Sequence, residues 1–348
     1  MSGLENYWSR ITPLHLILFP VSLLFRLLTA LRRALYRGGI LPSHKLPVPV
    51  IVVGNISVGG TGKTPLTLAL AQQLVERGRH PLIVSRGYGG AAQQLQQVNA
   101  SSDARQVGDE PLLMARRNLC PVWIGQDRAA AAQAALQIHP QCDVVLCDDG
   151  LQHYRLRRDV EVAVVDGVSG FGNGLMLPAG PLREPVSRLR SVDAVVVNGG
   201  ETSTPDLFRR EKKGAINLAP TIGQYAMRLS GEIFHNLLDP AKTASAGHFH
   251  ATNNHAIAGI GHPQRYFRHL QALGIPFTPH PFPDHHPYLE TDLAFTGCDA
   301  ILLTEKDAVK CAAFADTRYW VLRVDAEIDP ILIDHILRKI TPHGRKTA

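Results

Sequence analysis

The sequence has few aromatic residues and few cysteines, and both shortages narrow the class of protein. Aromatic residues make up 6% of the 348 residues and apolar residues 45%, a balance that favours an Ala/Val/Leu-rich α/β enzyme over a carbohydrate- or nucleic-acid-binding protein. The five cysteines form no CxxC pair and have no histidine at zinc-site spacing, so we expect reduced core residues in a cytosolic protein. Internal repeats and low-complexity tracts are also missing. The length allows two modest domains.

Excess positive charge is scarce over most of the chain, although the formal net charge is +6. Residues 1–47 carry six basic residues and one acidic residue, so five of the six net charges lie there. The remaining body is nearly neutral, which argues against a basic groove for nucleic acid. We therefore expect no nucleic-acid partner, and nothing in the sequence implies an obligate protein partner.

The N-terminal segment lacks an uninterrupted hydrophobic run. Residues 14–28 are apolar but are broken by Ser22 and Arg26, and an arginine at a bilayer centre costs about 2.5–3.5 kcal/mol. At roughly 100° per residue, the polar side chains form one narrow stripe of roughly 80°: His15, Ser22, Arg26, Thr29, Arg33 and Arg37. This pattern predicts a helix in a membrane interface, with the apolar arc in acyl chains and the arginines at anionic head groups. The alternatives are a buried core helix or a signal peptide, and no small-residue cleavage site supports the latter.

The strongest signal is the glycine-rich segment Ser57-Val58-Gly59-Gly60-Thr61-Gly62-Lys63-Thr64, between the apolar run 48–53 and a helical pattern over 66–74. This order predicts a phosphate-binding loop (P-loop), in which backbone N–H groups and a helix N-terminus face phosphate oxygens. Lys63 would reach the β- and γ-phosphates, and the Thr64 hydroxyl would ligate Mg²⁺. Ser57 replaces the usual first glycine, but three glycines remain at the tight part of the turn. A chance glycine-rich turn is the alternative, and the flanking strand and helix patterns favour the nucleotide site.

A second chemical signal is the apolar run 144–147 followed by Asp148-Asp149-Gly150. An acidic side chain at such a strand end can hold the Mg²⁺ that bridges the β- and γ-phosphates. Taken alone, the segment is equally typical of a strand-to-turn junction. The P-loop upstream favours the metal-binding interpretation, and which of the two aspartates ligates the metal stays open.

The chain alternates short apolar runs with helical stretches, which is typical of a mostly parallel sheet covered by helices on both faces. The first group of predicted strands is 48–53, 81–85, 121–124, 143–147, 160–166 and 193–198, and the predicted helices are 64–77, 110–117 and 128–138. The pattern restarts after about residue 210, with apolar runs at 255–260 and 300–304 and a helix over 263–273. We expect residues 93–105 to form a mobile loop.

These patterns predict an α/β protein with a P-loop NTPase-like core and a second, smaller α/β domain. Two alternating segments, 224–237 and 318–328, would pair as a two-stranded linker. The expected divisions are a membrane-interface helix in 1–47, a P-loop core domain in 48–223, the linker and smaller domain in 224–328, and a C-terminal helix and tail in 329–348.

Further segments fall where strand ends line the ligand crevice of an open α/β sheet. They are Ser85-Arg86-Gly87-Tyr88, Gly108-Asp109-Glu110-Pro111, Asp148-Asp149-Gly150-Leu151-Gln152-His153, Pro181-Leu182-Arg183-Glu184 and Phe282-Pro283-Asp284-His285-His286. Each alone is also typical of turns, helix caps or solvated pairs. Together with the segment 54–65, they closely resemble the tetraacyldisaccharide 4'-kinases, the lipid A 4'-kinases of Gram-negative bacteria. The resemblance covers nearly the whole chain, including the amphipathic N-terminus and the segment 303–310.

The resemblance implies a P-loop kinase of two α/β domains joined by a two-stranded linker, at the cytoplasmic face of the bacterial inner membrane. It implies transfer of the γ-phosphate of ATP to the 4'-hydroxyl of a tetraacylated glucosamine disaccharide 1-phosphate, an acylated lipid substrate.

The resemblance also implies residue roles. Asp109 would receive the proton of the sugar hydroxyl, assisted by His285 from the second domain. Lys63 would neutralise charge on the transferred phosphoryl group, and Thr64 with Asp148 or Asp149 would organise Mg²⁺. Arg183 and Glu184 would shape the phosphate end of the site. His153 is a weaker candidate, and sequence alone does not decide whether His285 or His286 points inward.

Three other classes compete with a kinase. A membrane-associated P-loop ATPase switch of the positioning type would carry a second lysine where this chain has Val58. A GTPase would need a spacer between Lys306 and Asp307 in a guanine-reading motif, and none is present. A non-catalytic lipid-binding scaffold would have decayed nucleotide elements, whereas the P-loop lysine and the aspartates are all present.

Overall fold

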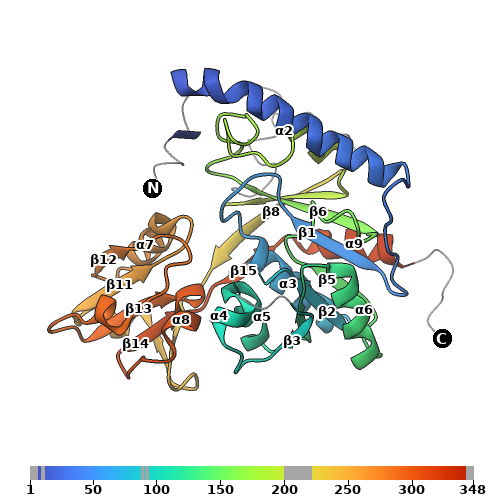
Figure 1. The fold of residues 1–348 in the computed structure, drawn as a ribbon. Coiled ribbons are helices and arrows are strands. Elements are labelled where there is room, and N and C mark those ends of the chain that lie inside the picture. The colour runs from blue at the N-terminus through green and yellow to red at the C-terminus, as the bar shows by residue number, and fades with distance from the viewer. Residues whose placement is uncertain (1–6, 9–11, 88–89, 91–93, 200–221, 342–348) are drawn as a thin grey trace.

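The computed structural model describes residues 7–8, 12–87, 90, 94–199 and 222–341, and its central feature there is a nine-stranded sheet (Figure 1). The spatial order is β15-β8-β7-β6-β1-β5-β2-β4-β3. Neighbouring strands are parallel except at the two edges, where β3 is antiparallel to β4 and β15 is antiparallel to β8. The strands are β1 (Val50–Gly54), β2 (Pro81–Ser85), β3 (Gln96–Val98), β4 (Val122–Ile124), β5 (Val144–Cys147), β6 (Val160–Asp166), β7 (Ala194–Asn198), β8 (Gly223–Ser230) and β15 (Asp325–Ile328).

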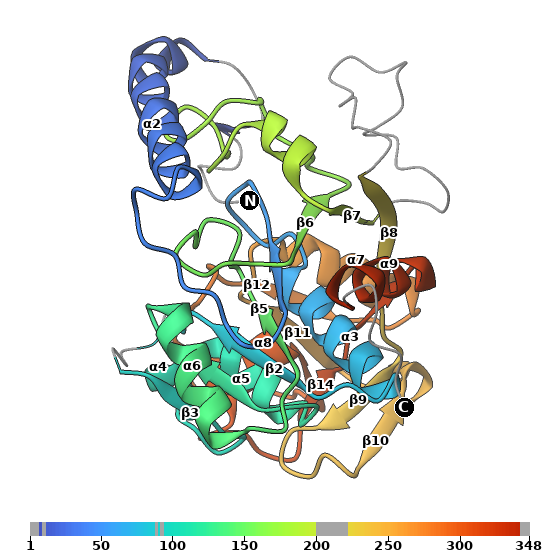
Figure 2. The same ribbon diagram turned by 90° about the vertical axis from the view of Figure 1, so that its right-hand side faces the viewer.

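Helices cover both faces of this sheet, as parallel strands buried on both faces require (Figure 2). The core on one face includes side chains of α3 (Lys63–Glu76), α5 (Asp109–Arg116) and α9 (Pro330–Ile340). On the opposite face, the alanines of α6 (Arg128–Ile138) pack against the sheet. The strands β1, β2, β5 and β7 are buried at every position, so their Val/Ile/Leu-rich composition follows from their place in the sheet. Shorter helices are α4 (Ala104–Val107) and the 3₁₀ segment Val186–Ser191.

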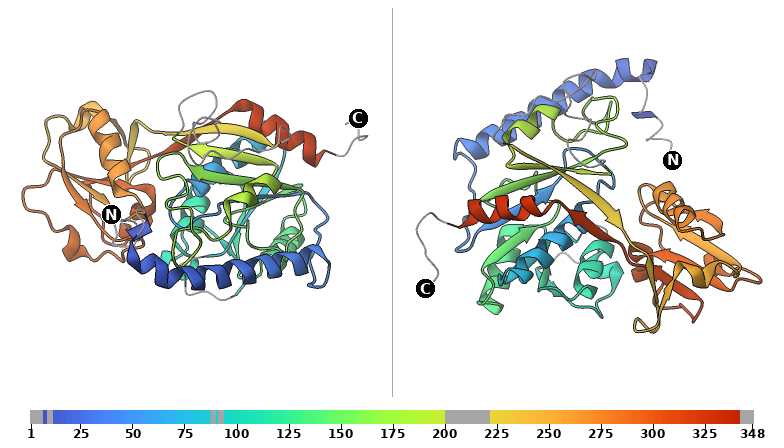
Figure 3. Two further views of the ribbon diagram at one scale, coloured as in Figure 1. Left: turned by 90° about the horizontal axis from the view of Figure 1, so that it is seen from above. Right: turned by 180° about the vertical axis from the view of Figure 1, so that it is seen from behind.

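A second sheet of six strands forms a smaller α/β unit beside the first (Figure 3). Its order is β10-β9-β14-β13-β11-β12, and the run from β14 to β12 is parallel. The strands are β9 (Ile233–Asn236), β10 (Thr243–Ser245), β11 (Asn254–Ala258), β12 (Thr278–Pro281), β13 (Ala300–Thr304) and β14 (Tyr319–Leu322). The helices are α7 (Pro263–Ala272), α8 (Glu305–Cys311) and the 3₁₀ segments Ala246–Phe249 and Glu290–Leu293. Aromatic side chains of α7 fill one face of this sheet and α8 covers the other.

The prediction of an α/β protein with two units is therefore confirmed, and the structure shows how the two linker segments divide between the sheets. Each of the two predicted linker segments contains two strands, one for each sheet. In the first segment β8 belongs to the large sheet and β9 to the small one, and in the second β14 belongs to the small sheet and β15 to the large one. The strands β8 and β15 pair with each other in antiparallel register, so the chain crosses between the units on one two-stranded ribbon.

The predicted strands and helices of the core are present, but the loop expected over 93–105 is partly wrong. Residues 96–98 form β3, which pairs antiparallel with β4, and α4 begins at Ala104. This edge strand pairs on one side only, and its sequence of two glutamines and one buried valine, Val98, has no strand periodicity that could have revealed it. All five cysteines are free and four are buried, as expected for core residues.

The N-terminal helix is present as α2 (Pro13–Arg37), but part of its polar stripe points the wrong way for the expected membrane contact. His15 and Ser22 are 2% and 4% exposed and face the protein. The Ser22 hydroxyl donates to the Met176 carbonyl at 2.9 Å and accepts from the Ala179 amide at 3.0 Å. Arg33 donates to the Ser191 hydroxyl at 2.6 Å. The polar stripe thus docks the helix on the loops beyond β6 (Figures 1 and 3).

The outward face of α2 is apolar. Leu16, Ile17 and Leu27 are 77%, 71% and 64% exposed, and seven more large apolar side chains of this helix are exposed. By length and composition α2 could cross a membrane, and little of its apolar stretch is buried. Arg26 and Arg37 remain exposed. The part of the chain that the structure describes therefore leaves a long hydrophobic surface on α2 exposed, which a soluble monomer rarely presents.

Candidate functional site

The P-loop joins the end of β1 to the start of α3 and is held from behind by two asparagines. Asn55 donates from Nδ2 to the Thr61 hydroxyl at 3.1 Å, and Asn198 donates from Nδ2 to the Thr61 carbonyl at 3.0 Å. Gly62 has a φ of +96°, and a Cβ there would lie 2.5 Å from the Asn198 amide nitrogen. Gly62 is therefore required by both backbone conformation and space. Gly59, with a φ of +100°, meets only the conformational requirement.

The first half of the P-loop is clamped by the segment 181–184. The Val58 amide donates to the Pro181 carbonyl at 2.8 Å, and Ser57 forms an antiparallel bridge with Leu182. Ser57 can replace the usual glycine because this bridge needs only extended backbone. The clamp fixes the loop on one side, while Gly59 and Gly60 stay exposed on the other.

Two carboxylates lie beside the loop at the end of β5, which neighbours β1 in the sheet. The buried Asp148 accepts from the Thr67 hydroxyl at 3.0 Å, one turn into α3. Asp149 pairs with Lys63 at 3.8 Å and with Arg183 at 3.2 Å. The strand register therefore brings both aspartates, the P-loop lysine and Arg183 together.

The two aspartates have opposite electrostatics. Burial raises the pKa of Asp148 to about 7, and the nearby carboxylates of Glu110 and Asp149 add to the rise. Burial alone would also raise the pKa of Asp149, but the positive charges of Lys63 and Arg183 outweigh it and the pKa is lowered. Asp149 is thus a permanent anion within an ion-pair cluster, while Asp148 is a carboxylate that needs a cation.

The residues at this point fit Mg²⁺. Among the described residues, Oδ2 of the buried Asp148 has no hydrogen-bond partner, and such a group requires compensation. Thr64 lies three residues before Thr67 in the first turn of α3, so the two side chains share a helix face. Within the described part of the chain, no cluster of three or more His, Cys, Asp or Glu side chains forms a ready metal cage. Mg²⁺ is usually coordinated by a few protein oxygens, and phosphate and water oxygens complete its coordination.

An acid–imidazole pair joins the two units. His285 lies 176 residues from Asp109 in sequence, yet its Nδ1 lies 3.1 Å from the Asp109 Oδ2. Asp109 begins α5, after Gly108 with a φ of +89°. His285 has a φ of +61°, a strained conformation for a non-glycine residue. His286 instead contacts Asp292 of its own unit at 3.1 Å, so His285 is the inward-facing ring.

Further contacts close the same interface. Ion pairs from the large unit to the small unit are Glu110–Lys306 at 3.5 Å, Arg117–Glu305 at 2.7 Å and Asp166–Arg265 at 2.5 Å. The loop after β11 also reaches the P-loop, because a Cβ on Gly261 would lie 3.3 Å from the Gly60 amide nitrogen. The small unit therefore lies against the exposed side of the phosphate loop.

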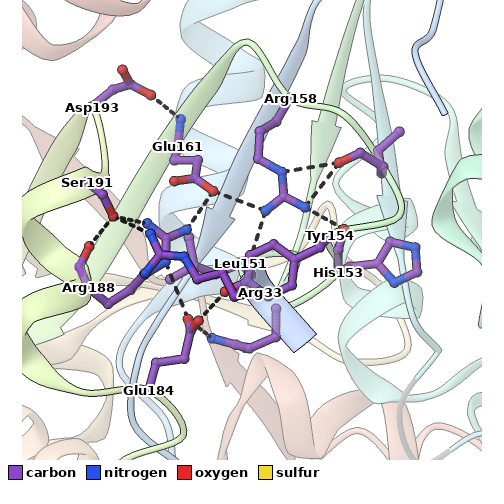
Figure 4. A network of polar contacts seen from close by, with 12 residues as sticks. Arg33, Leu151, His153, Tyr154, Arg158, Glu161, Glu184, Arg188, Ser191 and Asp193 are labelled. Carbon is purple, nitrogen blue, oxygen red and sulfur yellow. Dashed lines mark hydrogen bonds and ion pairs between the residues drawn. The ribbon is translucent and has the colours of Figure 1, made fainter. Parts of the chain in front are cut away.

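The two charged residues of the segment 181–184 separate in the structure. Arg183 faces Asp149, but Glu184 is buried and turned into a network of polar side chains (Figure 4). Glu184 accepts from the Tyr154 hydroxyl and from Gln152, which also donates to the Asn55 carbonyl at 2.9 Å. Glu184 thus supports the strand end that enters the P-loop, in place of the phosphate contact expected for it.

The His153 side chain makes its ionic contact with Asp127, which is not part of the phosphate loop. Its Nε2 lies 3.8 Å from Asp127, and burial beside Arg128 lowers the pKa of its ring to about 4. The ring is neutral near pH 7.

The centre of the network is Arg188, whose side chain is 1% exposed. It pairs with Glu161 at 2.6 Å and with Glu184 at 3.6 Å. It also donates to Ser191, which accepts from Arg33 of α2 (Figure 4). The network therefore ties the N-terminal helix to the segment that clamps the P-loop.

Replacing this arginine gives a stability prediction. Arg188→Met removes the cation that faces the buried Glu184, which keeps its hydrogen bonds from Tyr154 and Gln152. It leaves Glu161 paired, among the described residues, with Arg158 alone. We expect a loss of about 3–5 kcal/mol in the free energy of unfolding, the usual cost of removing one partner of a buried ion pair. Arg190→Met, at an exposed position of the same 3₁₀ segment, should change it by less than about 0.5 kcal/mol. Urea denaturation of both variants measures the difference. Equal stability of the two would show that the network contributes no net energy.

Several site residues had no clear signal in the sequence. Thr67 and Asn198 lie in ordinary helix and strand-end positions. Their roles depend on the sheet order, in which β5 is next to β1 and β7 lies on the other side of β1, beyond β6. Lys306 belongs to a segment that resembled the kinase family, but no role followed from the resemblance.

The buried strand, glycine-rich loop and lysine-headed helix, with carboxylates on the next strand, define a P-loop nucleotide-binding enzyme. A family model described as tetraacyldisaccharide-1-P 4'-kinase (LpxK) matches residues 14–341, and the chain belongs to this family. The tetraacyldisaccharide 4'-kinase of Azoarcus sp. is 50% identical, over all of this chain and 98% of that protein. That of Dechloromonas aromatica is 49% identical, over 99% and 98% of the two chains.

A solved structure supports the same assignment. The LpxK of Aquifex aeolicus, crystallised in complex with ATP, is similar with a TM-score of 0.76 and 28% sequence identity. The match covers 94% of this chain and all of that one. The chain is accordingly a kinase of lipid A biosynthesis.

Proposed function

We propose that the site between the two units transfers the γ-phosphate of ATP to the 4'-hydroxyl of a tetraacylated glucosamine disaccharide 1-phosphate. The observation that carries this proposal is the Asp109–His285 pair at 3.1 Å in an interface that also contains the P-loop. ATP would enter with its phosphates on the loop amides of residues 57–62 and its γ-phosphate toward this pair.

Catalysis in this proposal is positioning and charge stabilisation, as in other phosphoryl transfers. Asp109 accepts the proton of the attacking hydroxyl, and His285 holds the carboxylate by a hydrogen bond from the opposite unit. Lys63 and Arg183 stabilise charge on the phosphoryl oxygens. Their ion pairs with Asp149 hold both cations in place before the nucleotide arrives.

Asp148 and Thr64 are the residues that would hold Mg²⁺, with Asp149 beside them. Bound Mg²⁺ neutralises charge on the β- and γ-phosphates. The unpartnered oxygen of Asp148 supports this assignment. Asp149 is already committed to Lys63 and Arg183, which makes Asp148 the better direct ligand.

The raised pKa of Asp148 leads to a pH-dependent prediction. Its pKa in the folded protein lies above the ordinary value of 3.8, so the folded state binds the proton more tightly and the metal-free protein loses stability as pH rises through about 7. In EDTA at pH 8, Asp148→Asn should therefore stabilise the protein by on the order of 1 kcal/mol, or about 2–4 °C. The gain should shrink by pH 6, as measured by thermal unfolding across this range. A variant that is less stable at pH 8 would contradict the assignment.

The lipid end of the proposal rests on α2. Its apolar face is exposed and its inner face is tied to the P-loop clamp, so the helix would lie in the cytoplasmic face of the bacterial inner membrane and present the catalytic unit to an acylated substrate. Basic side chains at its exposed edge, Arg26 and Arg37, would meet anionic lipids.

A single charge on the exposed face tests this anchoring. Leu27→Glu should weaken binding to vesicles of anionic lipid by about tenfold or more, because inserting a leucine is worth about 1.5–3 kcal/mol. Thermal stability should not change, since Leu27 is 64% exposed. Val75→Glu, at another exposed apolar side chain outside α2, is the matched control in a vesicle sedimentation assay. Equal binding of both variants would place the anchor elsewhere.

The alternative function is a membrane-associated ATPase switch, and acceptor dependence separates it from the kinase. We expect ADP formation by the purified protein with Mg²⁺-ATP to require the tetraacylated disaccharide 1-phosphate. The same rate of ADP formation with lipid vesicles alone would favour the switch.

A further inference from the structure

The segment 304–310 builds the interface between the units. Thr304 ends β13 and caps α8 by accepting from the Asp307 amide at 3.2 Å. The next three side chains then make contacts outside the helix. Glu305 binds Arg117 of the large unit, Lys306 lies among the groups of the acid–imidazole pair, and Asp307 accepts from the Gly259 amide at 3.1 Å. Asp307 therefore holds the loop after β11, and this loop continues to Gly261, which lies against Gly60 of the P-loop.

Lys306 is the member of this segment closest to the reacting groups. Its ammonium nitrogen lies 3.0 Å from Asp284 Oδ1, 3.3 Å from His285 Nε2 and 3.5 Å from Glu110 Oε1. Its side chain is 16% exposed. Burial acts to lower the pKa of Lys306, but Glu110 and Asp284, with a smaller contribution from Asp109, outweigh it and the pKa is raised. Lys306 is therefore a charged ammonium group in this interface.

An ammonium group at this place determines which nitrogen of His285 carries the proton. Lysine offers donors and no acceptor, so Nε2 of His285 accepts from it at 3.3 Å. The Asp284 carboxylate also lies near this nitrogen, at 3.9 Å, but it accepts from the lysine at the shorter distance of 3.0 Å. The ring proton is then on Nδ1, which lies 3.1 Å from the Asp109 carboxylate and donates to it. The hydrogen bond on one ring nitrogen thus sets the role of the other.

The backbone of His285 gives the ammonium a second task. A φ of +61° is unfavourable for a histidine, and such strain persists only where the surroundings hold it. The ammonium group of Lys306 binds the side chains of both His285 and the preceding residue, Asp284, so it stabilises the strained backbone at His285 through two contacts.

We propose that Lys306 is a positioning residue that keeps Nε2 of His285 as a hydrogen-bond acceptor, so that the ring carries its proton on Nδ1 and donates it to Asp109. This inference rests on the proposed function, because it concerns the same acid–imidazole pair. It gives the segment 304–307 one purpose, which is to bring the small unit onto the phosphate loop with the imidazole already oriented.

The test compares Lys306→Met, which removes the charge, with Lys306→Arg, which keeps a donor. Lys339→Met is the matched control, since it removes a lysine paired with Asp193 far from the site. The ring ¹⁵N resonances of His285, assigned by their loss in His285→Gln, report which nitrogen is protonated. Turnover and the KM for ATP are measured on the same proteins.

We expect the wild type, Lys306→Arg and Lys339→Met to show an unprotonated Nε2 and a protonated Nδ1. In Lys306→Met the proton should move to Nε2, and kcat should fall by about 10²-fold with KM for ATP changed less than about threefold, because a misplaced imidazole proton is costly where a carboxylate depends on it. Lys306→Arg should recover most of the lost turnover.

Three results would overturn the inference. They are a protonated Nε2 in the wild type, an unchanged tautomer in Lys306→Met with reduced turnover, and unchanged turnover in Lys306→Met. The wild-type resonance decides the question even if Lys306→Met fails to fold. Failure of the proposed function is separate, because it would appear as turnover retained in Asp109→Asn.

Discussion

Asp109→Asn is expected to lower kcat by about 10²–10⁴-fold while the KM for ATP changes little. An asparagine keeps the size of the side chain and can still accept from His285, but it cannot take up the proton of the attacking hydroxyl. Asp109 lies at the start of α5, and its carboxylate contacts His285 of the small unit. Because this account gives Asp109 no part in binding ATP, we expect the substitution to slow the chemical step and to leave ATP binding intact. Steady-state kinetics with varied ATP and lipid acceptor measure it.

The control for this variant is nearby. Asp103→Asn changes an exposed aspartate that caps α4, where asparagine is an equally good cap, so its activity should match the wild type. If Asp109→Asn binds ATP weakly but keeps its turnover rate, Asp109 is a nucleotide contact and the proton acceptor lies elsewhere.

Lys63→Ala is expected to lower kcat/KM by at least about 10²–10³-fold, the usual cost of removing one preorganised donor from a developing anion. The fold should survive, because among the described residues the Lys63 ammonium makes one long ion pair, 3.8 Å from Asp149, and Arg183 still neutralises that carboxylate. The thermal midpoint should stay close to the wild-type value.

The same substitution at an exposed lysine, Lys45→Ala, should leave both turnover and stability unchanged. Wild-type activity in Lys63→Ala would remove the kinase role of this loop.

Local sequence patterns correctly predicted the elements whose structure depends mainly on residues close together in the chain. The P-loop, the strand before Asp148 and the core helices are each encoded within about a dozen residues, because apolar periodicity, glycine placement and capping act over that range. The strand β3 was missed for the opposite reason. Two of its three residues are glutamines, and only pairing with β4 makes the segment a strand.

Long-range geometry could not be predicted in this way. The pairing of Asp109 with His285 followed from the family resemblance, since nothing local joins two residues 176 positions apart. The choice between His285 and His286 depends on a left-handed backbone at His285.

The N-terminal helix shows a further limit. Its periodicity predicted a polar stripe and an apolar arc, but the stripe binds the protein through Ser22 and Arg33. A polar face fits either water or a polar loop, and the sequence alone does not distinguish them.

The central claim is that this chain phosphorylates the 4'-position of its lipid acceptor. The most direct measurement is mass spectrometry of the lipid after incubation with purified protein and Mg²⁺-ATP, with Lys63→Ala as the inactive control. We expect the wild type to add one phosphate, located at the 4'-position by fragmentation, and the variant to add none. Consumption of ATP with an unmodified lipid, or a phosphate at another position, would contradict the account.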